Sequence, residues 1–268
     1  MPRQIIKSNN RNINNYNTND RNYHHHELSL REKENVVAMD CEMVGVGPYG
    51  HRSALARVTI VSYDHHILFD AYIKVNEPVT DFRTFVSGIR PCDLLSDKAV
   101  SLDDARVVVR SIIKRKILVG HGLKCDLTAL SISHPWYNIR DTANYFPYMK
   151  QGTTLYYNSG AGNCSNNQSK EPRKLKDLAR HILGWNIQDD NRAHGHCSYE
   201  DAVASMALYK VARLDWEGLM KWKINKTRNI VQKKLHVNSS NASIATNATT
   251  STLSSCDDWS TSNSDCSY

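Results

Sequence analysis

The pattern of apolar and polar positions changes near residue 36 and again near residue 222. Between these points apolar residues recur with the periods of buried strands and amphipathic helices, whereas the flanking segments show no such period. Residues 1–35 contain nine Asn and a run of three His, and 238–268 contain 19 Ser, Thr or Asn among 31 residues. Such compositions bury too little apolar surface to fold. We therefore predict one domain over 36–222, a disordered segment over 1–35, and a basic and then disordered tail over 223–268.

Within this domain the pattern predicts strands first, and then alternating helices and strands. Residues 36–44 form a nearly continuous apolar run, as in a buried strand, and 56–63 and 67–74 have the pattern of a hairpin. The other expected elements are a helix over 101–116 with a Ser101–Asp104 capping box, a strand at 117–120, a helix over 124–131, a strand near 137–140, a surface loop over 152–172, and helices over 174–183 and 198–214, the last capped by Ser198. This order predicts an α/β fold with a mixed sheet.

Charge and composition narrow the function only slightly. The chain has 34 Lys and Arg against 27 Asp and Glu, a net charge of +7 that is spread over the core and both flanks. The exception is 221–234, which has six basic residues and no acidic one. This segment is either a nucleic-acid contact or nuclear-import patch, or a solvated helix end. Seven cysteines without a C-x-x-C pair argue against a structural zinc site and favour reduced thiols.

The sequence lacks the apolar signals of secretion and membrane insertion. Its first residues contain no apolar segment like that of a secretory signal, and no run approaches the ~18 apolar residues of a membrane-spanning helix. We therefore expect a protein that is not secreted and has no membrane partner. Together with the basic segment at 221–234, this favours the nucleus or nucleolus, with or without a cytoplasmic pool.

Two acidic residues lie inside the first apolar run. Strand alternation places Asp40 and Glu42 on one face, with Cys41 on the other. Two carboxylates at this spacing repel each other and lose hydration when buried, and Mg²⁺ or Mn²⁺ is the natural compensation. The alternative is that one acid lies exposed at the strand end and pairs with Lys or Arg, which is the commoner explanation of an isolated D-x-E.

Three further residues strengthen the case for a site. Asp126 follows another buried strand at a strand-to-helix junction, where ligand sites of open α/β sheets gather. Asp201 lies in the first turn of the last predicted helix, where it also fits the acid of a capping box. That capping role does not require a histidine, yet His196 stands five residues earlier in the preceding loop.

The ordered set Asp40, Glu42, Asp126, His196 and Asp201 resembles the DEDDh 3′→5′ exonucleases of the RNase H-like superfamily. Longer strings carry the resemblance further: AMDCEMVG at 38–45, TDFRTFVSGI at 80–89 and GHCSYEDAVASMALY at 195–209. They are similar to the branch that contains interferon-stimulated 20-kDa exonuclease, apoptosis-enhancing nuclease and the Rex-type RNA exonucleases. The resemblance covers roughly 36–216.

The resemblance implies a DnaQ-type exonuclease fold with a mixed five-stranded sheet. It implies metal-dependent 3′→5′ hydrolysis of single-stranded RNA to nucleoside 5′-monophosphates. Single-stranded DNA is a possible second substrate of the same activity. The implied site consists of Asp40, Glu42, Asp126 and Asp201 as ligands of two Mg²⁺ or Mn²⁺ ions, His196 as general base, Met43 against the terminal base or sugar, and Arg83 as either a nucleotide contact or a surface ion pair.

The sequence leaves two other functions open. The first is an exonuclease of the same fold that acts chiefly on single-stranded DNA. Contacts to the 2′-OH distinguish RNA from DNA, and no motif in the sequence identifies such contacts. The second is a non-catalytic RNA-binding or ribosome-assembly factor of the same fold. The sequence departs from the family pattern at Phe85, where relatives usually carry a basic residue. His121 and Asp141 also match family positions, and we interpret both as structural.

Overall fold

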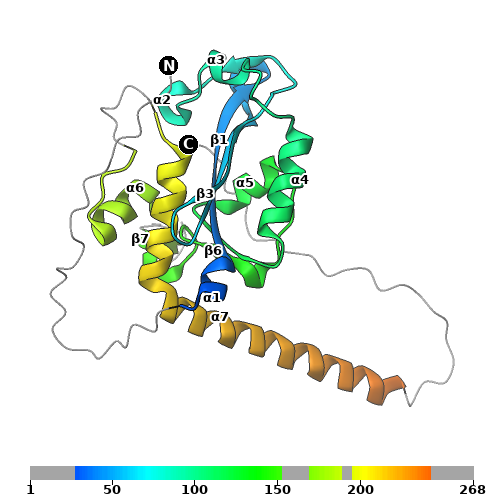
Figure 1. Cartoon of the computed structure of the whole chain (residues 1–268). Helices are drawn as coiled ribbons and strands as arrows, with labels where there is room; N and C mark the ends of the chain where they lie inside the picture. The colour runs from blue at the N-terminus through cyan, green and yellow to red at the C-terminus, as the bar shows by residue number, and fades with distance from the viewer. Residues whose placement is uncertain (1–27, 153–168, 189–194, 243–268) are drawn as a thin grey trace, which may run out of the picture.

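The computed structural model describes residues 28–152, 169–188 and 195–242 (Figure 1). Most of the two predicted disordered segments, and most of the predicted 152–172 loop, lie outside these residues. Where the structure does describe the N-terminal segment, it contains a helix, α1 (Leu30–Glu34), that begins at a Ser29–Glu32 capping box. The prediction of disorder up to residue 35 is therefore wrong for this turn, because the local cap outweighs the polar composition.

A mixed sheet forms the centre of the domain, as predicted. Its strands follow the order β3-β2-β1-β5-β6, and a short sixth strand, β4, pairs with β1, so the sheet exceeds the five strands expected. β2 and β3 run antiparallel to their neighbours, and β5 and β6 continue parallel to β1. The strands are β1 (Val36–Val46), β2 (Arg52–Ser62), β3 (Ile67–Tyr72), β4 (Val79–Asp81), β5 (Ile117–Gly120) and β6 (Ile139–Asp141).

Helices cover both faces of this sheet (Figure 1). α4 (Leu102–Ile113) and α5 (Leu123–Ala129) lie on one face, where they pack on Val37 and Met39 of β1. α6 (Leu175–Leu178) with its π-helical continuation (Ala179–Leu183), and α7 (Ser198–Ala242), cover the other face, where they pack on Val36 and Ala38. β1 therefore sends alternate side chains into two different cores.

Short elements connect these layers. α2 (Thr84–Ser87) and α3 (Pro91–Leu94) lie between β4 and α4, and a small two-stranded sheet is formed by β7 (Lys150–Gly152) and β8 (Ser169–Glu171). The remaining elements are three 3₁₀ turns at Pro48–Gly50, Trp136–Asn138 and Phe146–Tyr148.

The last helix differs most from its prediction. α7 is 45 residues long and extends to Ala242, whereas we predicted a helix over 198–214, a basic segment after it and disorder from residue 238. Ser198 is its first helical residue rather than its cap, and the Ser198 hydroxyl forms a buried 2.7 Å hydrogen bond with the hydroxyl of Thr59 on β2. Arg140 of β6 fixes the middle of the helix through two 2.7 Å hydrogen bonds to the Glu217 carboxylate.

The sequence also led us to expect reduced thiols and no membrane-spanning helix. Cys41, Cys92 and Cys197 carry free thiols. Cys125 is disulfide-bonded, contrary to the expectation of reduced thiols throughout. Among the described residues, no helix combines the length and apolar character that crossing a bilayer requires.

Candidate active site

The site begins on β1, at the two acids predicted to share a face. Asp40 and Glu42 lie on the same side of the strand as Val36 and Ala38, which is the side that α7 covers. Cys41 and Met43 point into the opposite core. On β2, Thr59 pairs with Asp40 and Arg57 pairs with Glu42, and the register slips by one residue directly after Glu42. The alternation argument is confirmed.

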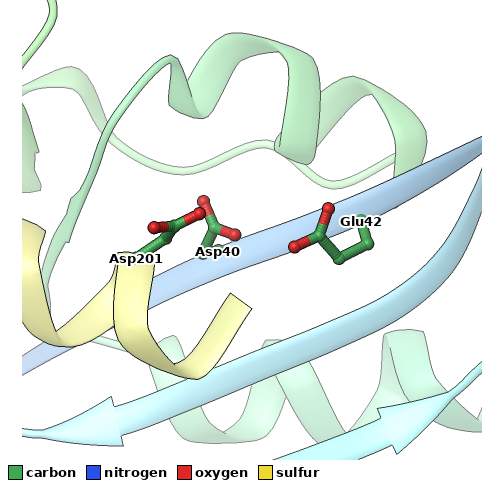
Figure 2. A group of neighbouring side chains, drawn as sticks. All are labelled: Asp40, Glu42 and Asp201. Atoms are coloured by element: carbon green, nitrogen blue, oxygen red, sulfur yellow. The ribbon is translucent and has the colours of Figure 1, made fainter. Parts of the chain in front are cut away.

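The first turn of α7 brings the third acid to this face. The Asp201 amide donates to the Cys197 carbonyl at 3.0 Å, which starts the helix directly above the strand. As a result, carboxylate oxygens of Asp40, Glu42 and Asp201 all lie within 4.8 Å of one another (Figure 2). Glu42 and Asp201 are buried, whereas Asp40 is partly exposed. Residues 161 positions apart in the chain thus form one acidic cluster.

Asp126 approaches the cluster from α5. The amide of Gly122, the residue before this helix, donates to Asp141 at 2.8 Å, and the Leu123 amide donates to the same carboxylate at 3.2 Å. Asp141 therefore caps α5 and fixes the direction of Asp126, which supports its structural interpretation. Asp126 is buried, and its charge acts on both Asp40 and Glu42.

The carboxylates disfavour one another's ionisation. Burial, and then the charges of Asp201, Asp126 and Glu42, raise the pKa of Asp40 well above its usual range. Burial raises the pKa of Asp126, followed by the charge of Asp141. Burial also raises the pKa of Asp201 to about 7, although a hydrogen bond from Gln188 opposes this shift. The protein alone thus leaves the cluster short of positive charge.

Three carboxylate oxygens of these four acids have no hydrogen-bond partner among the described residues. They are Oε1 of Glu42, Oδ2 of Asp126 and Oδ1 of Asp201, and all are buried. A buried carboxylate oxygen without a donor is costly unless a cation binds it. Because hard divalent cations prefer carboxylate oxygens, the donor set fits Mg²⁺ or Mn²⁺.

His196 lies at the same end of α7, in the loop before the helix. Its amide donates to the Val86 carbonyl of α2 at 2.7 Å, and its side chain is partly exposed. Gly195 makes this approach possible, because a Cβ there would lie 2.4 Å from the Thr84 carbonyl oxygen and the backbone has a positive φ of 65°. The loop is therefore held tightly against α2.

The side chains of the two predicted substrate contacts are engaged within the protein. Met43 is 6% exposed and packs in the core beneath α4 and α5. The Arg83 guanidinium donates to the Ser53 hydroxyl at 2.9 Å and to the Gly50 carbonyl at 2.8 Å. Arg83 thus connects α2 with β2 and with the turn before β2. Hydrogen bonds hold its guanidinium among the described residues, rather than the surface ion pair that we predicted as the alternative.

Gln188 is a site residue that the sequence did not reveal. Its side-chain amide donates to Oδ2 of Asp201 at 2.8 Å, and its backbone has a positive φ of 52°. It therefore orients one oxygen of Asp201 and leaves the other without a donor. No motif surrounds Gln188, and only the tertiary contact identifies it.

Comparison with known proteins shows the family of the chain. A family model described as Exonuclease (RNase_T) matches residues 37–209. RNA exonuclease 4 of Kluyveromyces lactis is 44% identical over 183 residues, which cover 68% of this chain and 55% of that protein. RNA exonuclease 4 of Homo sapiens is 40% identical over 184 residues, which cover 69% of this chain and 38% of that protein. This chain thus matches about half, or less, of these relatives' length.

Solved structures show the same fold. The Saccharomyces cerevisiae Pan2 pseudoubiquitin hydrolase–RNA exonuclease module in complex with A7 RNA superimposes with a TM-score of 0.54 at 27% identity, over 74% of this chain and 32% of that chain. The same module in complex with AAGGAA RNA gives a TM-score of 0.54 at 26% identity, over 77% and 34%. These matches confirm the predicted RNase H-like fold.

Proposed function

Because the chain belongs to the RNase_T exonuclease family, we propose that it is a metal-dependent 3′→5′ exonuclease that degrades single-stranded RNA to nucleoside 5′-monophosphates. The observation that carries the proposal is the convergence of Asp40, Glu42 and Asp201 within 4.8 Å. The names of the relatives and the RNA bound to the Pan2 module favour RNA over DNA as the substrate.

Four carboxylates are the proposed ligands of two divalent cations. Asp40, Glu42 and Asp201, which converge, would hold one ion, and Asp126 would help to hold the second. The cations would lower the pKa of the attacking water and stabilise the charge on the leaving oxygen. The protein contributes a rigid and mostly buried donor set, since the acids project from a central strand and from two helix starts.

His196 is the proposed general base. A histidine with an ordinary pKa of about 6.5 accepts a proton efficiently near neutral pH. The hydrogen bond from the His196 amide to Val86, together with the close packing of Gly195, fixes the position of the loop. A ring nitrogen of His196 would take the proton of the attacking water and later release it to solvent.

Two residues retain proposed roles in substrate binding. Since the Met43 side chain is buried, a contact with the terminal nucleotide would come mainly from its backbone, beside the register slip in β1. Arg83 would act both by direct contact and by holding α2, because its guanidinium already donates to Gly50 and Ser53.

The test uses the full chain and a 5′-labelled 20-nucleotide RNA, with matched DNA, in Mg²⁺, Mn²⁺ and EDTA. Wild-type protein should shorten the RNA from its 3′ end in either metal and not in EDTA, and a 3′-phosphate should slow it. Asp40→Asn should reduce kcat by roughly 10³-fold, because a loss of several kcal/mol of transition-state stabilisation has this effect. Asp97→Asn, an exposed acid, is the control.

Three results would contradict the proposal. Equal activity of Asp40→Asn and Asp97→Asn would remove the acidic cluster from catalysis. Faster degradation of DNA, compared by kcat/KM, would reassign the substrate. RNA binding without turnover in either metal would favour a non-catalytic binding factor.

A further inference from the structure

α7 continues far beyond the domain that it helps to build. Its buried side chains end with Trp216 and Met220. From Lys221 to Lys234 every side chain is exposed except Ile224, which is partly exposed. Figure 1 shows this extension leaving the domain in a different direction from the part of α7 that packs on the sheet. We call residues 221–234 the helical arm, and it lies outside the family match at 37–209.

The helical arm carries charge of one sign only. Six of its residues are Lys or Arg and none is Asp or Glu, and the next acid towards the N-terminus is Glu217. Lys223 and Lys226 stand three residues apart on one side of the helix, where like charges destabilise a helix. An exposed helix that has neither a buried face nor opposite-charge pairs is poorly stabilised by itself. A polyanion would relieve this repulsion.

An aromatic ring lies among these charges. Trp222 is 57% exposed, and the Lys226 ammonium lies 4.8 Å from the centre of its ring. Spacings of three and four residues continue the same face along the arm. The six side chains that line one shallow hollow on this face are Trp222, Asn225, Lys226, Asn229, Ile230 and Lys233. Exposed aromatic rings among basic side chains are the features that bind single-stranded nucleic acids without sequence preference.

We propose that the helical arm is a second RNA-binding surface, which holds the phosphate backbone of the substrate upstream of the 3′ end in the active site. Basic side chains would neutralise phosphates, and Trp222 would stack on a base. The proposal rests on the proposed exonuclease function, which supplies the RNA. It commits to RNA, rather than to an acidic protein or an import receptor, because the arm presents an exposed base-stacking ring together with its charges.

Helix geometry sets the length of RNA that can reach the arm. About 21 residues separate Asp201 from Trp222, so the two lie at most about 31 Å apart along the helix. A stacked strand with one phosphate every ~3.4 Å covers this distance in about nine nucleotides. A four-nucleotide RNA, stacked over only ~14 Å, would occupy the active site without engaging the arm. The arm should therefore act on long substrates only.

The test compares RNAs of four and 30 nucleotides, using the full chain in Mg²⁺. The variant Lys223→Gln, Lys226→Gln, Lys233→Gln removes three charges with residues of similar helix propensity. Its KM for the 30-mer should rise about tenfold with kcat unchanged, whereas its kinetics on the four-mer should stay within twofold of wild type. Its salt dependence should weaken, with a slope of log K against log salt smaller by about two, since each single-strand phosphate contact contributes about 0.7.

Two control variants separate the arm from general effects. Replacing the same three lysines by arginine keeps the charge and should keep the KM of the 30-mer. Replacing three exposed basic residues elsewhere, by Lys98→Gln, Lys114→Gln and Arg180→Gln, removes the same charge and should leave the 30-mer KM within twofold. Circular dichroism checks that the glutamine variant of the arm remains helical.

The results distinguish failure of this proposal from failure of the proposed function. An unchanged KM for the 30-mer, or an equal change for both RNAs, would overturn the proposal that the arm binds RNA. Binding of a protein partner would then be the remaining role of the arm. If wild-type protein degrades neither RNA, the exonuclease proposal fails. In that case, equilibrium binding of the 30-mer tests whether the arm binds RNA. Equal affinity of wild type and the glutamine variant would overturn RNA binding by the arm, and an affinity about tenfold lower in the variant would support it.

Discussion

Replacement of Asp201 by Asn should stabilise the metal-free protein and abolish its nuclease activity. Asp201 is 3% exposed, and its Oδ1 has no hydrogen-bond donor among the described residues. Asn keeps the size of the side chain and retains an oxygen that can accept from Gln188. The substitution removes only the negative charge. This charge destabilises the metal-free fold, but it is needed to bind a cation. Stability and activity should therefore change in opposite directions.

The magnitude follows from the pKa of Asp201. Burial raises this pKa from an ordinary 3.8 to about 7. One pKa unit corresponds to about 1.36 kcal/mol, so at pH 7.5 the ionised Asp201 costs the folded state roughly 4 kcal/mol of stability. Because Asp201 interacts with the other acids, replacing it alone recovers only part of this cost. We expect Asp201→Asn to raise the free energy of unfolding by about 2–4 kcal/mol. A raised pKa stabilises the fold fully below pH 3.8, and this contribution is lost as pH rises through 7. The advantage of Asn should therefore shrink towards pH 4.

The assay is urea denaturation of both proteins in EDTA at pH 7.5 and pH 4.5, followed by Mg²⁺ titration. The denaturation midpoint of Asp201→Asn should exceed that of wild type at pH 7.5, with an unchanged slope, and most of this difference should disappear at pH 4.5. Asp97→Asn, on the surface, should change the free energy of unfolding by no more than about 0.5 kcal/mol at either pH. A destabilised Asp201→Asn at pH 7.5, or a gain that is the same at both pH values, would refute the electrostatic argument.

Three further predictions concern stability and the position of the active-site loop. Glu217→Gln should reduce the free energy of unfolding by about 2–4 kcal/mol in urea denaturation, because it leaves the 3%-exposed Arg140 side chain without its counter-charge. Glu77→Gln, in a solvent-exposed ion pair with Arg52, should reduce it much less, and equal losses would contradict this. Gly195→Ala should reduce kcat far more than Gly184→Ala, measured on the same RNA, because both have positive φ but only Gly195 lacks space for a Cβ; similar kcat values would show that the loop position does not matter. Mg²⁺ at 100 times its Kd should raise the free energy of unfolding in EDTA-treated protein by about 2.7 kcal/mol, and no shift in the denaturation midpoint would argue against a metal site.

Much of the site was predictable because local rules determine it. Strand alternation placed Asp40 and Glu42 on one face, and the strand-to-helix junction placed Asp126 beyond the end of strand β5. The five-residue offset placed His196 in the loop before Asp201. Each of these rules depends on neighbours within a few residues, and so the sequence carries it directly.

The unpredicted features depend on distant partners. Ser198 has the sequence of a helix cap, but its hydroxyl bonds Thr59, which lies 139 residues away, and no local pattern reports this. Gln188 became a partner of Asp201 only through tertiary packing. Strand β4 has three residues, too few to show a period. The end of α7 was misplaced because we followed the apolar period to residue 214, although no Gly or Pro interrupts the chain between Leu219 and Ala242.

α7 connects the two proposed RNA contacts. Its first turn supplies Asp201, its middle is fixed to β6 by the buried Arg140–Glu217 pair, and its exposed end is the helical arm. Because the packed part of α7 contains Asp201 and ends at Met220, directly before the arm, the arm begins at a defined position relative to the acidic cluster. A strand that binds both places would therefore enter the site along one direction, and each removed nucleotide would require the strand to slip along the arm. Contacts to phosphates and base faces permit such slipping because they are the same at every nucleotide, whereas base-specific contacts would oppose it. A non-specific arm is thus the kind of second site that is compatible with an enzyme that shortens RNA stepwise.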